Sequence, residues 1–147
     1  MTSTVVGLLL VGIATMYGGP LDSGAHEDRP LYCDMYDGKS HVFEVGAAPW
    51  IAVDVAHYES GAVQCGDMFL LLFEDDSVPS KGYSVVVAQA LDAGFLERHW
   101  VEDWGPDRRI VVDVPYLFWT QSGLAAPVQA INVSRAMRLL GEEGMEN

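Results

Sequence analysis

The sequence predicts an all-β fold, a sandwich or barrel of about seven or eight short strands with one small C-terminal helix. Half of the 147 residues are hydrophobic, and most stand in Val-, Ile- and aromatic-rich runs rather than at helical spacing. Fifteen glycines and seven prolines separate these runs and supply turns. We expect one domain in three parts: an apolar N-terminal arm or strand over residues 1–11, a β-barrel over 12–133, and a short helix with an acidic tail over 134–147.

The N-terminal stretch from Met1 to Gly19 carries no charged side chain. It has the apolar character of a secretory signal, but no basic residue precedes the apolar run, and the first Lys or Arg is Arg29. Glycines interrupt the run, which is also too short for a membrane span. We therefore favour a buried strand, or an apolar arm that packs against a partner.

The middle of the chain alternates strand-like runs with turn signals. The segment Leu31–Asp37 reads as a short strand or loop that ends in an Asp-Gly turn at 37–38. The runs 41–45 and 50–55 are the next strands in the order of the chain. Residues 68–73 read MFLLLF, so this strand is either buried on both faces or placed at an interface.

Two β-rich runs in the second half of the chain each lead into an aspartate. Residues 85–88 precede Asp92, and residues 110–112 precede Asp113. If both runs belong to one barrel, the two carboxylates come near strand ends, where a groove can hold them. This is the place where the sequence points most directly to chemistry.

The closing elements are a strand over residues 127–133 and a helix from Ser134 toward Met145. Serine is a favourable N-cap residue, and the helix has a partial apolar face. We expect Gly141 to end the helix early. The face consists of Ala136, Met137, Leu139 and Leu140.

The formal net charge is −13, with 21 acidic residues against 8 Lys and Arg. Nucleic acids and anionic membranes are unsuitable partners for such a chain, because they require clustered positive charge. The net negative charge is compatible with a neutral or cationic ligand and with a secreted or virion protein. It does not exclude a cytoplasmic protein. We find no phosphate-binding loop and no metal-ligand spacing, so we predict no cofactor and no metal.

The two cysteines, Cys33 and Cys65, leave two alternatives open. One is a disulfide, which stabilises a chain by about 3 kcal/mol for a loop of this size and indicates an oxidising compartment. The other is a pair of buried thiols that behave as small hydrophobic side chains.

Aromatic side chains gather around the second aspartate. Such residues stack on sugar rings and also anchor protein interfaces, so they predict a ligand-binding or a partner-binding surface, and part of them serves the core. They are Trp100, Trp104, Tyr116, Phe118 and Trp119.

Three segments, taken in order, carry a family resemblance. They are residues 12–18 (GIATMYG), residues 63–69 (VQCGDMF), and the pair 86–94 and 110–115, which combine an Asp-x-Gly turn with an apolar strand. Over most of the chain, these segments resemble double-psi β-barrel domains of the barwin-like, expansin and rare-lipoprotein-A type. The resemblance implies a six-stranded double-psi barrel with a polysaccharide groove.

Members of this family bind or cleave peptidoglycan or plant cell-wall glycan. By position, Asp113 matches the general acid of the catalytic members, and Asp92 matches the aspartate of the Asp-x-Gly turn. Tyr17 matches an aromatic of the groove floor, and His99 lies near a histidine that is functional in some members. The chain departs from the family at Gly18, where the cellulase branch has an aspartate, and in its long charged insert between Asp92 and Asp113.

Glycan cleavage needs a carboxyl group that protonates the leaving oxygen, and a second carboxylate at about 5–9 Å sets the course of the reaction. Asp113 and Asp92 are the candidates. The structural alternative is that Asp92 caps its turn and that Asp113 accepts backbone N–H groups.

Two classes of function follow. The first is a structural or assembly protein, such as a subunit of a virion or extracellular particle, which forms homo-oligomers through its apolar surfaces. The second is a peptidoglycan- or polysaccharide-binding or lytic domain that uses an aspartate in a groove.

Overall fold

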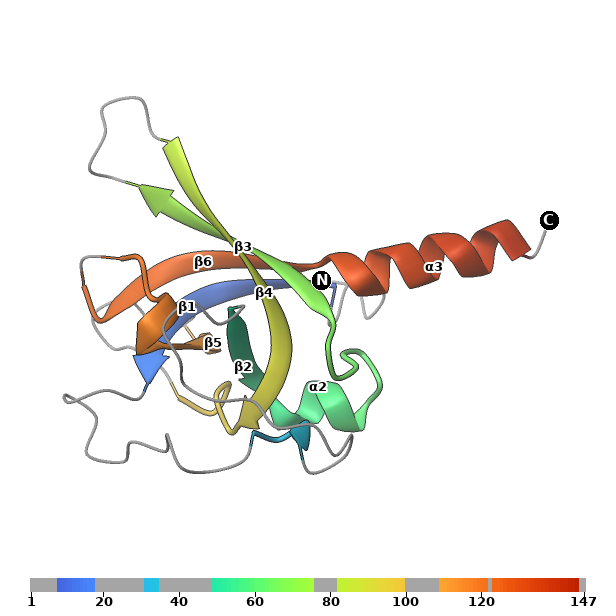
Figure 1. Cartoon of the computed structure of the whole chain (residues 1–147), viewed down its shortest axis with the longest axis horizontal. Helices are drawn as coiled ribbons and strands as arrows, with labels where there is room; N and C mark the ends of the chain where they lie inside the picture. The colour runs from blue at the N-terminus through green and yellow to red at the C-terminus, as the bar shows by residue number, and fades with distance from the viewer. Residues whose placement is uncertain are drawn as a thin grey trace.

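The computed structural model describes residues 8–17, 31–34, 49–75, 82–99, 109–121 and 123–145. Six strands in this part of the chain close a barrel in the order β1-β5-β2-β4-β3-β6 (Figure 1). The predicted β-barrel with a short C-terminal helix is therefore confirmed. The elements are β1 (Leu9–Tyr17), β2 (Trp50–Asp54), α2 (Val55–Glu59), β3 (Met68–Asp75), β4 (Gly82–Gly94), β5 (Ile110–Pro115), the 3-10 turn η3 (Tyr116–Phe118), β6 (Ala125–Asn132) and α3 (Val133–Met145).

The strand pairing repeats between the two halves of the chain. β1 runs parallel to β5 and antiparallel to β6, just as β4 runs parallel to β2 and antiparallel to β3. The antiparallel pairs β2–β5 and β3–β6 complete the barrel. The first half of the barrel is β1, β2 and β3, and the second half is β4, β5 and β6. If each strand is exchanged with its counterpart (β1 with β4, β2 with β5, β3 with β6), the pairing pattern stays the same. Each parallel pair joins one strand from each half.

Alternate residues of each strand point into the barrel and form its core, as the two-residue period of a strand requires. In β3, Phe69, Leu71 and Phe73 are buried, whereas Leu70 and Leu72 on the outer face are half-buried. The MFLLLF strand thus buries one face completely and the other partly. The other strands add to this core Leu10, Ala14, Ile51, Val53, Ala88, Ala90, Val111, Val112, Val114, Ala126, Val128 and Ala130.

β1 and β5 approach each other closely at Gly12. A Cβ atom at this position would lie 2.5 Å from the backbone oxygen of Arg109 and 2.9 Å from a methyl group of Val111. The N–H of Ile13 donates to the same Arg109 oxygen at 2.8 Å. A larger residue would push the two strands apart, so glycine is required in this strand.

Several predicted details differ from the structure. The six strands of the barrel confirm the strand number that the family resemblance implies, whereas residues 31–34 form no strand. The two aspartates lie within strands, because β4 continues to Gly94 and β5 to Pro115. The predicted strand over 41–45 lies outside the described residues.

The short helix α2 was not expected. It begins directly after β2, where the Asp54 carboxylate caps it by accepting the N–H of Ala56 at 3.0 Å. A helix of five residues is too short for a periodic apolar pattern, so the sequence gives little sign of it. No helix in the described part of the chain is long and apolar enough to cross a membrane.

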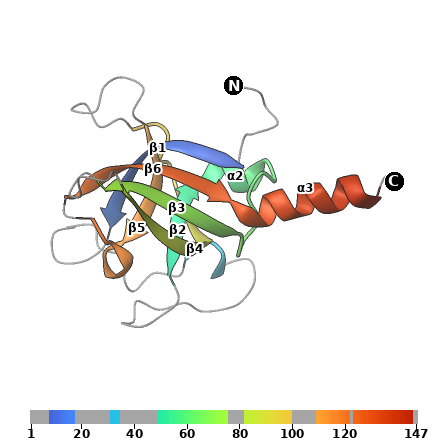
Figure 2. The ribbon, with the colours of Figure 1, turned by 90° about the horizontal axis from the view of Figure 1, so that it is seen from above.

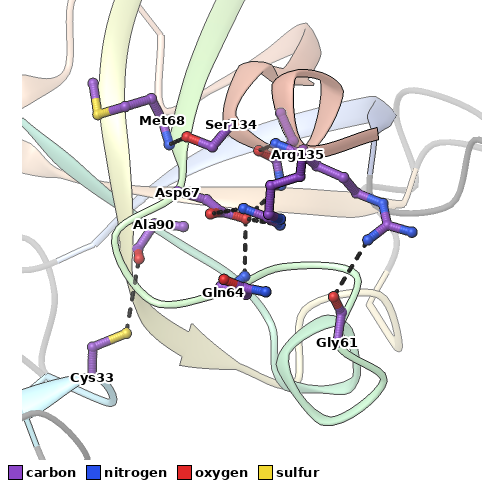
Figure 3. Close-up of polar contacts among 10 residues, drawn as sticks. Cys33, Gly61, Gln64, Asp67, Met68, Ala90, Ser134 and Arg135 are labelled. Carbon is purple, nitrogen blue, oxygen red and sulfur yellow. Dashed lines mark hydrogen bonds and ion pairs between the residues drawn. The ribbon is translucent and has the colours of Figure 1, made fainter. Parts of the chain in front are cut away.

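The helix α3 begins one residue earlier than predicted and has a different cap. Asn132, rather than Ser134, accepts the N–H of Arg135 through its side-chain oxygen at 3.0 Å. Ser134 instead accepts the N–H of Met68 at 2.8 Å, which ties the helix to β3 (Figure 3). Gly141 does not end the helix, which continues to Met145.

Asp67 anchors the start of α3 to the barrel. Its carboxylate is almost fully buried and accepts two hydrogen bonds from the Arg138 guanidinium, at 2.7 and 3.0 Å. It also accepts the Gln64 N–H and the Asn132 amide, both at 2.9 Å (Figure 3). Burial opposes ionisation of Asp67, but these donors outweigh it and hold the pKa of the carboxyl below its usual range.

We predict that Asp67→Asn lowers the free energy of unfolding by about 3 kcal/mol at neutral pH, because it removes the buried carboxylate that pairs with the Arg138 guanidinium. The pKa of Asp67 is lower in the folded than in the unfolded protein, so its stabilisation is present above about pH 4 and is lost as the pH falls through the folded pKa. Denaturant unfolding between pH 7 and pH 2 measures both effects.

Glu59→Gln is the matched control, because Glu59 is an exposed carboxylate of α2. It should leave the free energy of unfolding within about 0.5 kcal/mol of the wild type. If Asp67→Asn proved as stable as this control at pH 7, Asp67 would not anchor the helix.

Candidate functional site

The two predicted aspartates lie on either side of one residue of β2. Ala52 is the register partner of Asp92 on β4 and of Asp113 on β5. Asp113 is in turn the partner of Thr15 on β1. Since directly paired residues project to the same face of a sheet, the four form a row across β4, β2, β5 and β1. We call Asp92, Ala52, Asp113 and Thr15 the acidic row.

The acidic row lies on the outer surface of the barrel. The neighbours of Ala52 along β2, Ile51 and Val53, belong to the barrel core, so Ala52 points the other way. Both aspartates are half-buried. The alanine between them has the smallest side chain of β2 and is itself buried, with 4% of its surface exposed.

Thr15 holds one end of the row. Its hydroxyl donates to Oδ1 of Asp113 at 3.1 Å. This bond fixes the orientation of the carboxyl group while the side chain stays half-exposed. Asp113 is therefore positioned and also accessible, as an acid that acts on a ligand must be.

Tyr17, the last residue of β1, connects the two ends of the row. Its hydroxyl donates to Oδ2 of Asp92 at 3.1 Å. Burial raises the pKa of Tyr17 far above its usual value, and the negative charges of Asp92 and Asp113 raise it further. Tyr17 therefore stays protonated at every physiological pH and acts as a hydrogen-bond donor, not as a base.

Asp92 is fixed at three atoms. Besides Tyr17, it accepts the backbone N–H of Tyr32 at Oδ1 (3.0 Å) and the Tyr58 hydroxyl at its backbone oxygen (2.9 Å). The rings of Tyr32 and Tyr58 stack with centroids 4.8 Å apart. Burial, followed by the charge of Asp92, raises the pKa of Tyr58, which keeps this hydroxyl a donor as well. Asp92 thus organises the tyrosines around it.

The segment 31–34 covers one side of the acidic row and is held by a disulfide. Cys33 and Cys65 are bonded, with Cα atoms 5.7 Å apart, and the Cys33 N–H donates to the Leu91 oxygen at 2.9 Å. Around this link lies a second apolar cluster on the outer surface. It consists of Leu31, Cys33, Trp50 and Leu91, with Tyr32, Tyr58 and Phe118 packed against it.

A polar group that the sequence did not reveal lies beyond the ends of β2 and β4. His57 of α2 is buried, and its Nε2 contacts the carboxylate of Glu97 as an ion pair when the imidazole is protonated. The Glu97 N–H donates to Asp54 at 2.9 Å. These contacts hold the chain after β4 against α2, and so support the tyrosine side of the site.

The remaining predicted residues lie apart from the row or outside the described part of the chain. The His99 imidazole is exposed, and among the described residues no hydrogen bond or ion pair joins it to either aspartate. Trp119 packs edge-on against Phe73 of the barrel core, with centroids 5.9 Å apart. Trp100 and Trp104 lie outside the described residues. The roles predicted for all four remain predictions.

Sequence reasoning missed Tyr32 and Tyr58. Tyr32 stands in a turn and Tyr58 in a five-residue helix, and neither belongs to a motif around the aspartates. Within the described ranges, no three His, Cys, Asp or Glu side chains gather as a metal site would need.

No protein-family model, curated protein or solved structure matches this chain. The resemblance to barwin-like, expansin and rare-lipoprotein-A domains therefore remains a prediction. The site has to be judged on its own geometry.

We predict that reducing the Cys33–Cys65 disulfide lowers the free energy of unfolding by about 3 kcal/mol, the value expected for a loop of this length. It should also weaken the contact between Tyr32 and Asp92, because the bond holds the covering segment in place. Thermal unfolding with and without a phosphine reductant measures the first effect. The Cys33→Ser/Cys65→Ser variant is the control, and its melting temperature should not respond to reductant. An equal response in the variant would show that the reductant acts elsewhere.

Proposed function

We propose that the outer face around the acidic row binds a polysaccharide and that Asp113 acts as the acid toward a glycosidic oxygen. One observation carries the proposal. Asp92, Asp113 and Tyr17 are far apart in the sequence, and all three meet in one half-buried group on the barrel surface. They are the residues that the resemblance assigns to the groove.

The charge of the chain supports an uncharged, hydroxyl-rich ligand. With a net charge of −13, the protein repels polyanions at long range. Carboxylate oxygens accept hydrogen bonds from sugar hydroxyls, and the Asp113 carboxylate is half-exposed. Neutral glycan segments meet both requirements.

The contacts also divide the roles of the aspartates. Asp92 is engaged at both carboxylate oxygens and at its backbone oxygen, so it serves mainly to position Tyr17, Tyr32 and Tyr58. Asp113 is held by Thr15 and is half-exposed, which suits a group that exchanges a proton with a ligand.

The disulfide supports an extracellular setting for this function. Disulfides persist mainly in oxidising compartments, where cell-wall glycans are also found. An assembled particle outside the cell meets the same condition.

Binding to purified peptidoglycan sacculi and to microcrystalline cellulose tests the proposal, together with the release of soluble sugar from each. We expect the wild-type protein to be retained on one of these solids. Asp113→Asn should weaken binding about tenfold or more, the effect of losing a charge-assisted hydrogen bond. Any release of sugar should fall by a factor of about 10² to 10⁴, as for the loss of a general acid.

Two variants complete this experiment. Tyr17→Phe removes the hydroxyl that joins Tyr17 to Asp92 and should weaken binding less than Asp113→Asn. Glu59→Gln should bind as the wild type does, because Glu59 lies outside the row. A wild-type protein that binds neither solid would refute the proposal, and full activity of Asp113→Asn would remove Asp113 from its role.

A second candidate function is that of a structural or assembly subunit, for a virion or another extracellular particle. The observation that favours it is a group of exposed apolar side chains on β1 and β4 that do not belong to the acidic row. Val11 and Val85 are each 56% exposed, and Val87 is 49% exposed. Soluble monomers rarely leave such residues clustered on one surface.

Light scattering at micromolar to millimolar concentrations tests this second function. We expect a mass that is a multiple of 16.0 kDa and that grows with concentration. A single 16.0 kDa species over the whole range would contradict it.

A further inference from the structure

The strands β4, β3, β6 and β1 present an apolar surface on the outside of the barrel. In one row across these strands, Val85 pairs with Leu72, Leu72 with Gln129, and Gln129 with Val11. In the next row, Val87 pairs with Leu70, Leu70 with Ile131, and Ile131 with Leu9. Seven of these eight residues are apolar, and none is charged. We call the eight residues the sheet surface.

The helix α3 presents a second apolar surface. Met137 is 65% exposed and Leu140 is 62% exposed. At 3.6 residues per turn, they share a face with Val133 and Ala136. Arg135 and Arg138 lie on the opposite face, where they bond the Gly61 oxygen and Asp67. We call Val133, Ala136, Met137 and Leu140 the helix stripe.

The helix does not cover the sheet surface of its own barrel. It leaves β6 and extends outward, as Figures 1 and 2 show from two directions. Three residues in its first half, Ser134, Arg135 and Arg138, hydrogen-bond to other parts of the chain. Figure 3 labels the first two. A helix of 13 residues is marginal in water without tertiary packing. Among the described residues, neither the stripe nor the sheet surface therefore has the apolar layer that usually covers such faces.

We infer that two copies of this chain exchange these surfaces, so that the helix stripe of each copy lies on the sheet surface of the other. This arrangement rests on the assembly function proposed above and specifies its geometry. It forms a closed two-fold dimer, because each copy gives and receives the same contact.

Dimensions and area favour a second copy as the occupant. The helix stripe from Val133 to Leu140 is about 10 Å long, and four strands span roughly 14 Å between the outer strand axes. The stripe therefore fits within the width of the sheet surface. A partner on the sheet surface alone would bury much less than the about 800 Å² per partner of a stable complex. Reciprocal exchange buries both surfaces on both copies.

The charge of the chain gives the dimer a characteristic salt response. Two copies, each with a net charge of −13, repel each other at low ionic strength. The surfaces that meet contain no charged residue. Salt should therefore strengthen the dimer by screening the repulsion, whereas it would weaken a contact based on ion pairs.

The test compares two full-length variants and their mixture by light scattering. Val85→Gln/Val87→Gln changes the sheet surface, and Met137→Gln/Leu140→Gln changes the helix stripe. We expect each variant alone to dimerise at least tenfold more weakly than the wild type. An equimolar mixture should dimerise more tightly than either variant, because the mixed dimer keeps one intact helix-on-sheet contact.

Leu124→Gln is the control, because Leu124 is 63% exposed and lies outside both surfaces. It should dimerise as the wild type does, and circular dichroism should show all variants folded. The exchange would be overturned if only one of the two variants, sheet or helix, dimerised more weakly than the wild type. It would also be overturned if the mixture dimerised no more tightly than the separate variants. In these cases the proposed assembly function stands. A monomeric wild-type protein would instead refute both the assembly function and the exchange of surfaces.

Discussion

The position of β2 between β4 and β5 is the constraint on which the rest of the structure depends. Because Ala52 pairs with Asp92 on one side and with Asp113 on the other, the barrel itself sets the distance between the two carboxylates. No loop needs to move to bring them together. Tyr17 then connects β1 with β4, and the disulfide holds the covering segment over the same strands.

The attachment of the helix α3 depends on a different set of bonds. There Asp67 attaches α3 through buried polar bonds made by the first half of the helix. These bonds turn Arg135 and Arg138 toward the barrel and leave Met137 and Leu140 facing outward. The polar anchor thus determines which face of the helix is left for a partner. The ligand site and the assembly surface use different residues, so one chain can serve both roles.

Much of the fold can be predicted from the sequence, because strand runs and glycine turns are local signals. The strands around Trp50, Met68, Val86 and Val111 were predicted in place, and so was the terminal helix. The helix α2 and the cap at Asn132 were missed, since the first is too short for periodicity and the second depends on where β6 ends. The aspartates were identified by their position after β-rich runs. Their common neighbour, Ala52, depends on the pairing of distant strands, which no local pattern encodes.

The pairing pattern of the barrel has a consequence for how the chain folds. Of the six ladders among the described strands, only β3–β4 joins two strands that follow one another in the sequence. Both parallel ladders need strands from opposite halves, so neither half closes alone. Loop entropy is therefore lost before most contacts form, and a high contact order slows folding. We expect the β3–β4 hairpin to be the nucleus and the halves to fold as one cooperative unit. The other strands would then add to the β3–β4 hairpin, and the barrel would close late in folding.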